Sequence, residues 1–544
     1  MKPYILSSCV ITLIIFWQPL SLAAELPAGV VLDARQDVVR HLKDEPVSLD
    51  PAKAVGLPEI QVIRDLFEGL VNEDAHGKPA PGVAESWHSN NFRIWTFKLR
   101  KDARWSDGSP VTAQDFVYSW RRLVNPQTAS PFAWFAALAG IKNAFAIAKG
   151  NMALESLGVS ALDNTTLRVQ LERPVPWFPS LAANAALFPV RESNLARFGQ
   201  SWTAPGQLVG NGAFVLRERV VNEKLVLTPN RQYWDNAKTV LQRVTFVPVN
   251  QESAATKRYL AGDIDITESF PKNLYHKLLK EIPRQVHTPP QLGTYYYAFN
   301  TQKGPTADVR VRQALTMSID RRIVAQKVLG TGEKPAWHFT PDVTAGFSPE
   351  RSPLETTPQA ELNAQAKTLL QAAGYGPQRP LELSLLYNTS ENHQKIAIAV
   401  ASMWKKNLGV RVKLRNQEWK TYLDSRNSGD FDVIRASWVG DYNEASSFLS
   451  LLTSSHSGNI ARFHDDAYDA ALAKAGSESL DAARNRAYNI AENILLSRAP
   501  VAPIYQYTNA RLIKPWVRGY PIDNPEDVAY SRMLYVIKHD GGRR

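Results

Sequence analysis

The side chains best placed for chemistry lie in one short stretch that follows an apolar run. Phe431-Asp432-Val433-Ile434 is typical of a buried strand, and side chains alternate between two faces in the extended chain that continues from it. The residues that would share one face are Arg435, Ser437, Val439 and Asp441. A free strand edge between a base and an acid suits an extended zwitterion such as a peptide, because main-chain hydrogen bonds hold its backbone and the charges hold its ends. The spacing alone fits ordinary surface ion pairs at Arg435 and Asp441 at least as well.

A search for catalytic signatures favours binding over catalysis. The sequence has no Gly-x-Ser-x-Gly elbow, no His-Glu-x-x-His helix and no Ser-x-x-Lys set of the penicillin-recognising kind. Gly330–Lys334 is similar to a fragment of a phosphate-binding loop, but Pro335 stands where Ser or Thr is needed, so we expect a turn. His338 and His393 lie far apart and outside any ligand-spaced cluster, so we expect no metal and no other cofactor.

The first residues have the layout of a secretory signal peptide. Lys2 is followed by an apolar stretch, Val10–Trp17, and by the small-x-small site Ser21-Leu22-Ala23, which predicts cleavage after Ala23. A transmembrane helix is the alternative, but the stretch is short and no basic stop follows it. The only cysteine lies within this segment, so the mature chain has no thiol for a disulfide, a Cys-ligated metal site or a cysteine nucleophile.

The length and the net charge of the chain limit the number of domains and the kinds of partner that can be expected. The chain has 544 residues, more than one hydrophobic core normally supports, so two or more domains are expected. Its formal net charge is +11, but the Lys and Arg residues are dispersed and no basic run, zinc finger or recognition-helix pattern occurs, so we expect no nucleic-acid partner. The 14 Trp and 19 Tyr residues can fill cores and also line a ligand cleft.

Alternating periodicities predict an α/β fold. Leu381–Leu385 alternates as a strand, the helical spacing that starts at Glu391 ends at Gly409, and Val410–Leu414 alternates again. Strand, helix and strand within about 35 residues form a βαβ unit, for which parallel strands are expected. A second helix is predicted to begin after Thr357 as its N-cap.

Longer segments carry a resemblance that extends in order along the chain. They are Ser48–Pro51, Asp65–Leu70, Ala80–Trp87, Trp95–Arg100, Trp105–Gly108, Tyr259–Asp265 and Val309–Leu315. These segments resemble the peptide-binding receptors of bacterial oligopeptide and dipeptide permeases, the extracellular solute-binding proteins of family 5. The resemblance implies a periplasmic, monomeric receptor of an ABC peptide importer that binds short peptides and hands them to a membrane oligopeptide permease.

The resemblance also implies an α/β, two-lobed periplasmic binding protein fold, type II of the large peptide-binding class, with an additional third domain. The implied boundaries are 1–23 for the signal peptide; 24–67, 190–292 and 509–544 for lobe I; 68–189 for the inserted additional domain; and 293–508 for lobe III. Hinge closure of the two lobes would bury a bound peptide between them.

Individual roles follow from the resemblance, position by position. Asp441 would pair with the α-ammonium group of the peptide and Arg435 with the C-terminus of a tripeptide, whereas His393 matches a position that serves somewhat longer peptides. Strand-like hydrogen bonds to the peptide backbone would come from Ala436, Ser437, Trp438 and Val439 on one side and from Val55, Gly56 and Leu57 on the other. Further cleft-lining positions are Arg426, Trp419 and Tyr507.

Departures from the general oligopeptide receptors narrow the range of ligands that we expect. Gly293 and Val439 occupy two positions that a disulfide joins in those receptors. Leu329 replaces a lysine used there for the C-terminus of longer peptides, and Phe132 replaces a pocket tyrosine. These changes argue against broad uptake of tetra- and pentapeptides.

One ligand agrees with both the resemblance and the charges. Val55–Gln61 and Gln251–Pro271 are most similar to the family members that bind murein peptides. The murein tripeptide L-Ala-γ-D-Glu-meso-diaminopimelate has two carboxylates beyond its chain ends, partly offset by a second ammonium group. In a closed cleft each ion needs a partner, and Arg426 and Arg435 could fork onto two of its three carboxylates. The alternatives are a general oligopeptide receptor, with haem as a further ligand, and, from a different class, a periplasmic peptidase.

Overall fold

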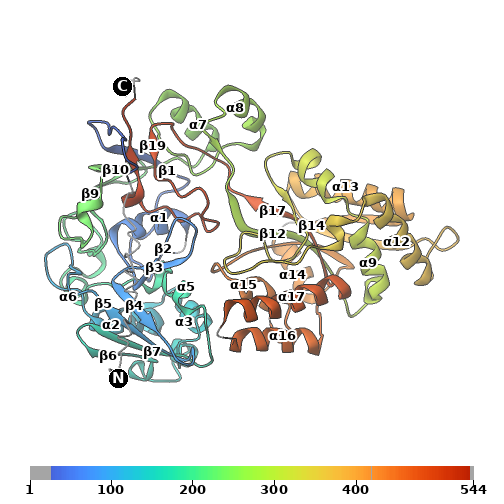
Figure 1. Ribbon diagram of the computed structural model, residues 1–544, viewed down its shortest axis with the longest axis horizontal. Coiled ribbons are helices and arrows are strands. Elements are labelled where there is room, and N and C mark those ends of the chain that lie inside the picture. Colours follow the sequence, from blue (N-terminus) through green and yellow to red (C-terminus); the bar gives the residue numbers. More distant parts are fainter. Residues whose placement is uncertain (1–25, 55, 418, 457, 479, 540–544) are drawn as a thin grey trace, which may run out of the picture.

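The computed structural model describes residues 26–539 except 55, 418, 457 and 479, so the predicted signal peptide lies outside the described residues. Two halves are visible in Figure 1. We call residues 26–289 and 509–539 the first half and residues 290–508 the second half. The chain passes from one half to the other at the two neighbouring strands β12 (Pro290–Phe299) and β17 (Val501–Thr508).

The second half is built on one six-stranded mixed sheet. Its strands, in spatial order, are β13 (Lys334–Pro335), β17, β12, β16 (Val433–Val439), β14 (Glu382–Asn388) and β15 (Arg411–Gln417). Because side chains alternate along β12, Tyr295, Tyr297 and Phe299 enter the core on one face. Tyr296 and Ala298 enter the core on the other face. Both faces of the central strand are therefore buried.

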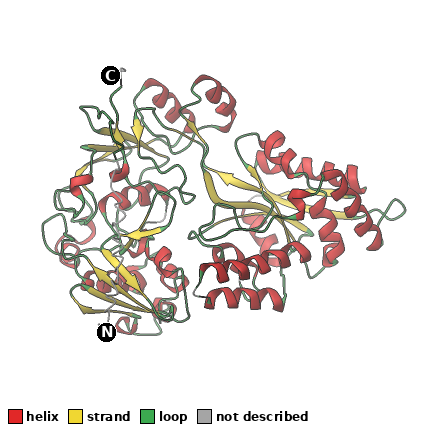
Figure 2. Ribbon diagram, in the orientation of Figure 1, coloured by secondary structure: helices red, strands yellow, loops and turns green. Residues whose placement is uncertain are grey.

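Helices cover both faces of this sheet (Figure 2). The face of Tyr295 packs on α9 (Val309–Met317), α12 (Gln359–Ala372) and α13 (Glu391–Leu408). The face of Tyr296 packs on α15 (Ser446–Leu449), α16 (Asp466–Ser477) and α17 (Asp481–Arg498). The remaining helices of this half are α10 (Arg321–Ile323), a π-helical turn (Val324–Leu329), α11 (Pro353–Thr356) and α14 (Trp419–Ser428).

The βαβ prediction is confirmed, with small differences at element ends. β14 and β15 run parallel in the register Glu382↔Arg411 to Asn388↔Gln417, and α13 connects them. The predicted N-cap Thr357 is wrong by one residue, because Thr357 is the C-cap of α11 and donates its N–H to the Pro353 carbonyl. Pro358 is the N-cap of α12 instead.

The first half contains two four-stranded sheets. One has the order β1 (Asp37–Leu42), β10 (Arg243–Pro248), β9 (Lys224–Pro229), β8 (Phe214–Val220), and the other β4 (Ala84–His88), β5 (Ile94–Leu99), β7 (Thr166–Gln170), β6 (Val159–Asp163). The first half also contains three two-stranded sheets. They pair β2 (Val71–Glu73) with β3 (Pro79–Pro81), β11 (Val286–His287) with β18 (Arg511–Leu512), and β19 (Val517–Arg518) with β20 (Tyr535–Val536). Its helices are α1 (Leu57–Leu66), α2 (Ala113–Val124), α3 (Ala133–Leu138), α4 (Ala144–Ala148), α5 (Phe178–Ala182), α6 (Glu192–Phe198), α7 (Glu252–Ala261) and α8 (Tyr275–Glu281).

Separate apolar cores support the division into two halves. One continuous cluster of buried side chains joins both sheets of the first half, including Leu42 and Phe246 in one sheet and Phe97 and Leu167 in the other. The two clusters of the second half contain residues of that half alone. We propose the boundaries implied by the resemblance, in which lobe III lies in the second half and the first half consists of lobe I with the inserted domain 68–189 packed on it. The shared core of the first half does not itself separate lobe I from that domain.

The described residues contain neither a candidate membrane-spanning helix nor a candidate metal-binding cluster. No helix there combines the length and apolar character needed to cross a bilayer. No group of three or more His, Cys, Asp or Glu side chains there is arranged to hold a metal ion.

Trp404→Ala is expected to destabilise the second half by about 3–5 kcal/mol, because Trp404 is fully buried and its Nε1 donates to the Leu315 carbonyl. Ile398→Ala, on the same helix but 52% exposed, is the matched control and should change stability by less than about 0.5 kcal/mol. Urea unfolding followed by far-ultraviolet circular dichroism measures both. Equal losses for the two variants would contradict the packing of α13.

Candidate functional site

β16 has one paired edge and one open edge. β12 pairs with it along its whole length, from Phe299↔Val433 to Gly293↔Val439. β14 pairs only with Val433 and Ile434. Within the described part of the chain, the edge opposite β12 therefore has no strand partner over residues 436–439.

Alternate residues present their main-chain groups at this open edge. The Gly440 N–H donates to the Leu292 carbonyl, and hydrogen-bonded pairs alternate along an antiparallel ladder. The N–H and C=O groups of Ser437 and Val439 consequently point away from β12. An extended peptide backbone laid along the edge would meet the donors and acceptors of these two residues.

Arg435 lies at the inner end of the open edge and is only 8% exposed. Its Nη2 donates to the hydroxyls of Ser437 and Tyr507, both at 3.1 Å, and its Nη1 donates to Asn388 Oδ1 at 3.3 Å. Its guanidinium carbon lies 4.8 Å from the centroid of the Tyr295 ring. Its Nε is buried and has no acceptor in the part of the chain that the structure describes. These partners are all neutral, so a buried cation is available to an anionic ligand.

The groups around this cation are held in their neutral forms. Burial, and to a smaller extent the charge of Arg435, lower the pKa of His393 to about 4. Burial raises the pKa of the Tyr295 hydroxyl, and the two rings lie 5.6 Å apart. Among the described residues, neither His393 Nδ1 nor the Tyr295 hydroxyl has a hydrogen-bond partner, and both atoms are buried. Buried polar atoms of this kind indicate a place where a further polar group binds.

A second guanidinium, that of Arg426, acts on the same buried tyrosines as Arg435. Arg426, on α14, acts with Arg435 on the side chain of Tyr422, where both positive charges oppose the rise of its pKa that burial causes. The Tyr422 hydroxyl in turn donates to the Arg435 carbonyl. Arg426 Nε is also buried, and none of the described residues offers it an acceptor. Two cations at one tyrosine favour a ligand with more than one carboxylate.

Asp441 follows the open edge at its outer end. Its N–H donates to Ser447 Oγ at 2.9 Å, while its carboxylate is exposed and takes no part in the ion pairs found among the described residues. Nearby protein atoms partly desolvate this carboxyl and raise its pKa. A positively charged group placed beside it would favour the ionised form.

Two cavities meet at Asp441, and each has walls from both halves. The smaller, of about 360 Å³, is lined by Leu57 from the first half and by Val439 and Asp441 from the second. The larger, of about 700 Å³, is lined by Trp177 from the first half and by Trp438 and Asp441 from the second. Volumes of this size are typical of small-ligand sites. Of the predicted charged residues, Asp441 therefore lies in a cleft between the halves, whereas Arg435, Arg426 and His393 line neither cavity.

The opposite wall of the cleft differs in detail from the expectation. Gly56 is the N-cap of α1, where its N–H donates to Glu59 Oε2 at 3.0 Å and its carbonyl accepts from the Ile60 N–H. In this arrangement Gly56 has no free main-chain donor for a peptide. Leu57, 60% exposed, faces the smaller cavity. Val55 and the side chain of Trp419 lie outside the described parts of the structure.

Phe132 and Leu329 do not line either cavity. Phe132 precedes α3 and stacks on Trp134 at a centroid distance of 5.7 Å. Trp134, and not Phe132, is among the rings that line the larger cavity. Leu329 ends the π-helical turn and packs against the core under α13. Sequence reasoning also missed Trp177 and Tyr442, because no local pattern relates two residues so far apart in the chain.

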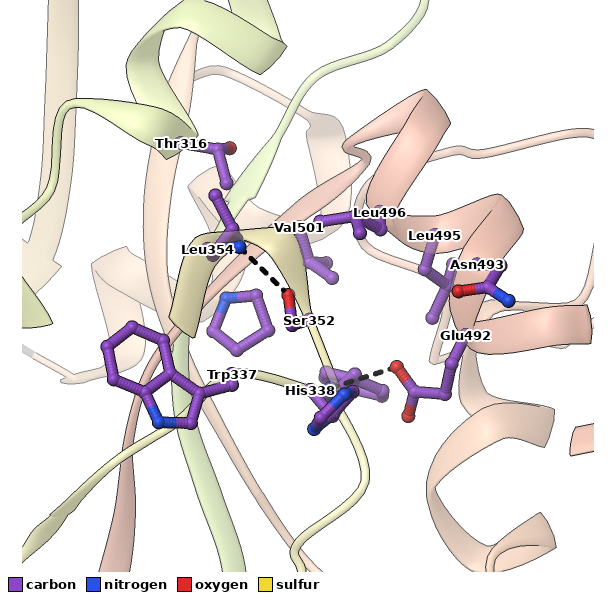
Figure 3. Close-up of a pocket in the computed structure, with 12 residues that line it drawn as sticks. Thr316, Trp337, His338, Ser352, Leu354, Glu492, Asn493, Leu495, Leu496 and Val501 are labelled. Carbon is purple, nitrogen blue, oxygen red and sulfur yellow. Dashed lines mark hydrogen bonds between the residues drawn. The ribbon is translucent and has the colours of Figure 1, made fainter. Parts of the chain in front are cut away.

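A small pocket inside the second half is unrelated to this cleft (Figure 3). His338 and Glu492 contribute to its wall, and its volume of about 20 Å³ has room for one water molecule. The Glu492 carboxylate accepts the N–H groups of Phe339 at 3.1 Å and Thr340 at 2.7 Å. Glu492 therefore satisfies buried main-chain donors.

An open strand edge with unpaired charges at both ends, set between two α/β halves, defines a solute-binding protein. The family model of the bacterial extracellular solute-binding proteins, family 5 Middle, matches residues 78–459, and the chain belongs to this family. Its relatives are binding proteins, and the chain is a binding protein and not an enzyme.

Two relatives from Escherichia coli cover nearly the whole chain. The periplasmic murein peptide-binding protein MppA is 73% identical over 520 residues, which are 96% of this chain and 97% of MppA. The periplasmic oligopeptide-binding protein OppA is 48% identical over 520 residues, 95% of this chain and 96% of OppA.

Solved structures confirm the fold class and identify the arrangement of the halves. The unliganded open form of the murein tripeptide-binding protein MppA has a TM-score of 0.91 at 73% identity, covering 94% of this chain and 99% of that one. A second structure of Escherichia coli MppA has the same identity, covers 94% of this chain and 100% of its own, and has a TM-score of 0.73. Because the identities are equal, the scores differ through backbone arrangement, and the present arrangement is that of the open form.

His393→Gln should flatten the pH dependence of stability between about pH 6.5 and 4. The unfolded chain protonates this histidine near pH 6.5, whereas burial lowers its pKa in the folded chain to about 4. The unfolded state therefore binds more protons in this window, and the stability of the unsubstituted protein falls as the pH is lowered. Urea titrations at several pH values measure the slope, with the exposed His464→Gln as control. An unchanged slope in His393→Gln would contradict a buried, neutral His393.

Proposed function

We propose that this chain is the periplasmic solute-binding component of an ABC peptide importer, and that it binds the murein tripeptide and some α-linked short peptides. It would deliver them to a membrane oligopeptide permease. The names of its relatives support this, since MppA is called a murein peptide-binding protein and OppA an oligopeptide-binding protein. We further propose that the chain is exported by a signal peptide cleaved after Ala23 and acts as a monomer.

The observation that carries the proposal is the separation of opposite charges along the open edge. The Arg435 guanidinium contacts Ser437 Oγ, so its charge lies at the level of residue 437. Four residues of extended chain separate that level from Asp441, about 13 Å at roughly 3.3 Å per residue. A zwitterion of three to four residues has this length, with its ammonium group at Asp441 and a carboxylate at Arg435.

The murein tripeptide can use both arginines, with one carboxylate left for another partner. It has three carboxylates and two ammonium groups, and each ion buried in a closed cleft needs a partner or an ordered water molecule. We assign one carboxylate to Arg435 and a second to Arg426, whose guanidinium groups can each form a bidentate pair. Tyr507 and His393 would hold Arg435 in position from the side.

The main-chain contacts complete the proposed site. Ser437 and Val439 would pair with the peptide backbone at the open edge, and Ala436 and Trp438 would maintain the ladder to β12 behind it. Leu57 would cover the peptide from the opposite half after closure.

A general oligopeptide receptor is the second candidate, and the larger cavity favours it. The first residue of the murein tripeptide is alanine, and one methyl group would leave most of the 700 Å³ beside Asp441 to water. A receptor for varied peptides would use that space for larger side chains.

Calorimetric titration of refolded, ligand-stripped protein separates the two candidates. We expect the murein tripeptide to bind more than about tenfold tighter than α-linked Ala-Glu-Lys, a difference of roughly 1.4 kcal/mol. Equal or reversed affinities would identify a general oligopeptide receptor. Binding of neither peptide would refute the proposed ligand class.

Arg426→Ala should weaken the murein tripeptide by about tenfold or more and leave an uncharged α-linked tripeptide within about threefold, because only the former has a second carboxylate to lose its partner. Arg411→Ala is the matched control, since Arg411 is exposed on the outermost strand and pairs with Glu382. Titration of both peptides into both variants measures the effect. Equal losses for the two peptides would refute the assignment of Arg426.

A further inference from the structure

Tyr442 belongs to the second half by sequence but to the first half by packing. Its side chain joins the continuous apolar cluster of the first half, and among the described residues it is the one member of that cluster from the second half. Its ring stacks on Trp177, with centroids 6.3 Å apart and an interplanar angle of 6°. Its hydroxyl forms a hydrogen bond of 3.0 Å with the Ser446 hydroxyl. The side chain is thus tied to both halves.

Asn443 makes a second contact across the boundary. Its Nδ2 donates to the Gly77 carbonyl at 3.4 Å, while its Oδ1 accepts from the Ala345 N–H at 2.7 Å. Gly77 has a φ of +73°, and a Cβ atom there would lie 2.8 Å from Asn443 Nδ2. The turn between β2 and β3 therefore approaches Asn443 as closely as a glycine permits.

These contacts fix the backbone that carries Asp441. The Asp441 carboxylate lines both cavities, and its N–H is bonded to Ser447 Oγ. The next two residues are each held by the first half. The direction of the Asp441 side chain therefore depends on packing against a part of the chain more than 250 residues away, at Trp177.

We propose that Trp177 and Tyr442 are positioning residues, which hold Asp441 ready for the amino end of a ligand while the cleft is open. The inference rests on the proposed pairing of Asp441 with the α-ammonium group. The stack is present in an arrangement that matches an unliganded open form. The side chain of Arg435, in contrast, makes its hydrogen bonds within the second half alone. A peptide would therefore bind first through its amino end.

The test compares Ala-Glu-Lys with N-acetyl-Ala-Glu-Lys by calorimetric titration, since acetylation replaces the α-ammonium group with a neutral amide and leaves the other charges of the peptide unchanged. The measured quantity is the ratio of the two dissociation constants. We expect a ratio of about thirty or more for the unsubstituted protein and a ratio within about threefold of one for Asp441→Asn. In Trp177→Ala the ratio should fall by about tenfold, while the affinity for the acetylated peptide stays within about threefold.

Two further variants make the result specific to the ring stack. Trp177→Phe keeps an aromatic face for Tyr442 and should retain a ratio close to that of the unsubstituted protein. Phe145→Ala removes a 66% exposed ring from the first half, away from both cavities, and should also retain it. If Trp177→Ala does not fold, Trp177→Leu replaces it, because leucine fills much of the space without an aromatic face, and the same fall is expected.

The outcomes separate this inference from the proposed function. A ratio near one for the unsubstituted protein, or an unchanged ratio in Asp441→Asn, would refute the pairing of Asp441 with the ammonium group and the inference with it. A collapsed ratio in Asp441→Asn with an unchanged ratio in the Trp177 variant would leave the proposed function standing and overturn the positioning role.

Discussion

Beyond Ile434, β14 and β16 separate, and the main-chain groups of Ser437 and Val439 are left facing a cleft. Main-chain N–H and C=O groups need hydrogen-bond partners, and in the open protein water can supply them. A peptide backbone can replace that water without regard to its side chains. Arg435 and Asp441 lie at the two ends of this edge because the chain stays extended between them. Every other part of the candidate site is placed relative to this short unpaired stretch of strand.

The electrostatic design of the inner end follows from burial. A guanidinium that is 8% exposed and whose hydrogen-bond partners among the described residues are neutral is costly to bury, and the tyrosines around Arg435 limit that cost through hydrogen bonds and ring contact. An internal carboxylate would neutralise the cation but would also compete with a ligand. The low pKa of His393 avoids adding a second buried charge at neutral pH. Burying the Arg435 guanidinium lowers the stability of the folded protein, and it creates a site that attracts carboxylates.

Closure of the two halves would change the shape of the cavities in which a ligand binds. The cavities beside Asp441 take their walls from both halves, so their final form depends on the angle between the halves. Leu57 lies on the opposite wall, and the open arrangement leaves it 60% exposed. Contacts made only after closure add to affinity, whereas contacts present in the open form select which end of a ligand is bound first. The stack of Tyr442 on Trp177 belongs to the second kind.

The sequence by itself determined what local periodicity and residue type can determine. Four features were predictable from the sequence, because each depends on neighbours in the chain or on matching segments. They are the βαβ unit from β14 to β15, the strand that leads into Arg435, the alternation that places Ser437 beside Arg435, and the family. The strand was expected from Phe431 and begins at Val433, since element ends depend on pairing. Only the tertiary structure decided that β14 leaves the edge of β16 unpaired after Ile434, and that the N–H of Gly56 caps α1. It also decided that Tyr442 packs into the core of the first half. These features arise from contacts between residues far apart in the chain, and no local pattern encodes them.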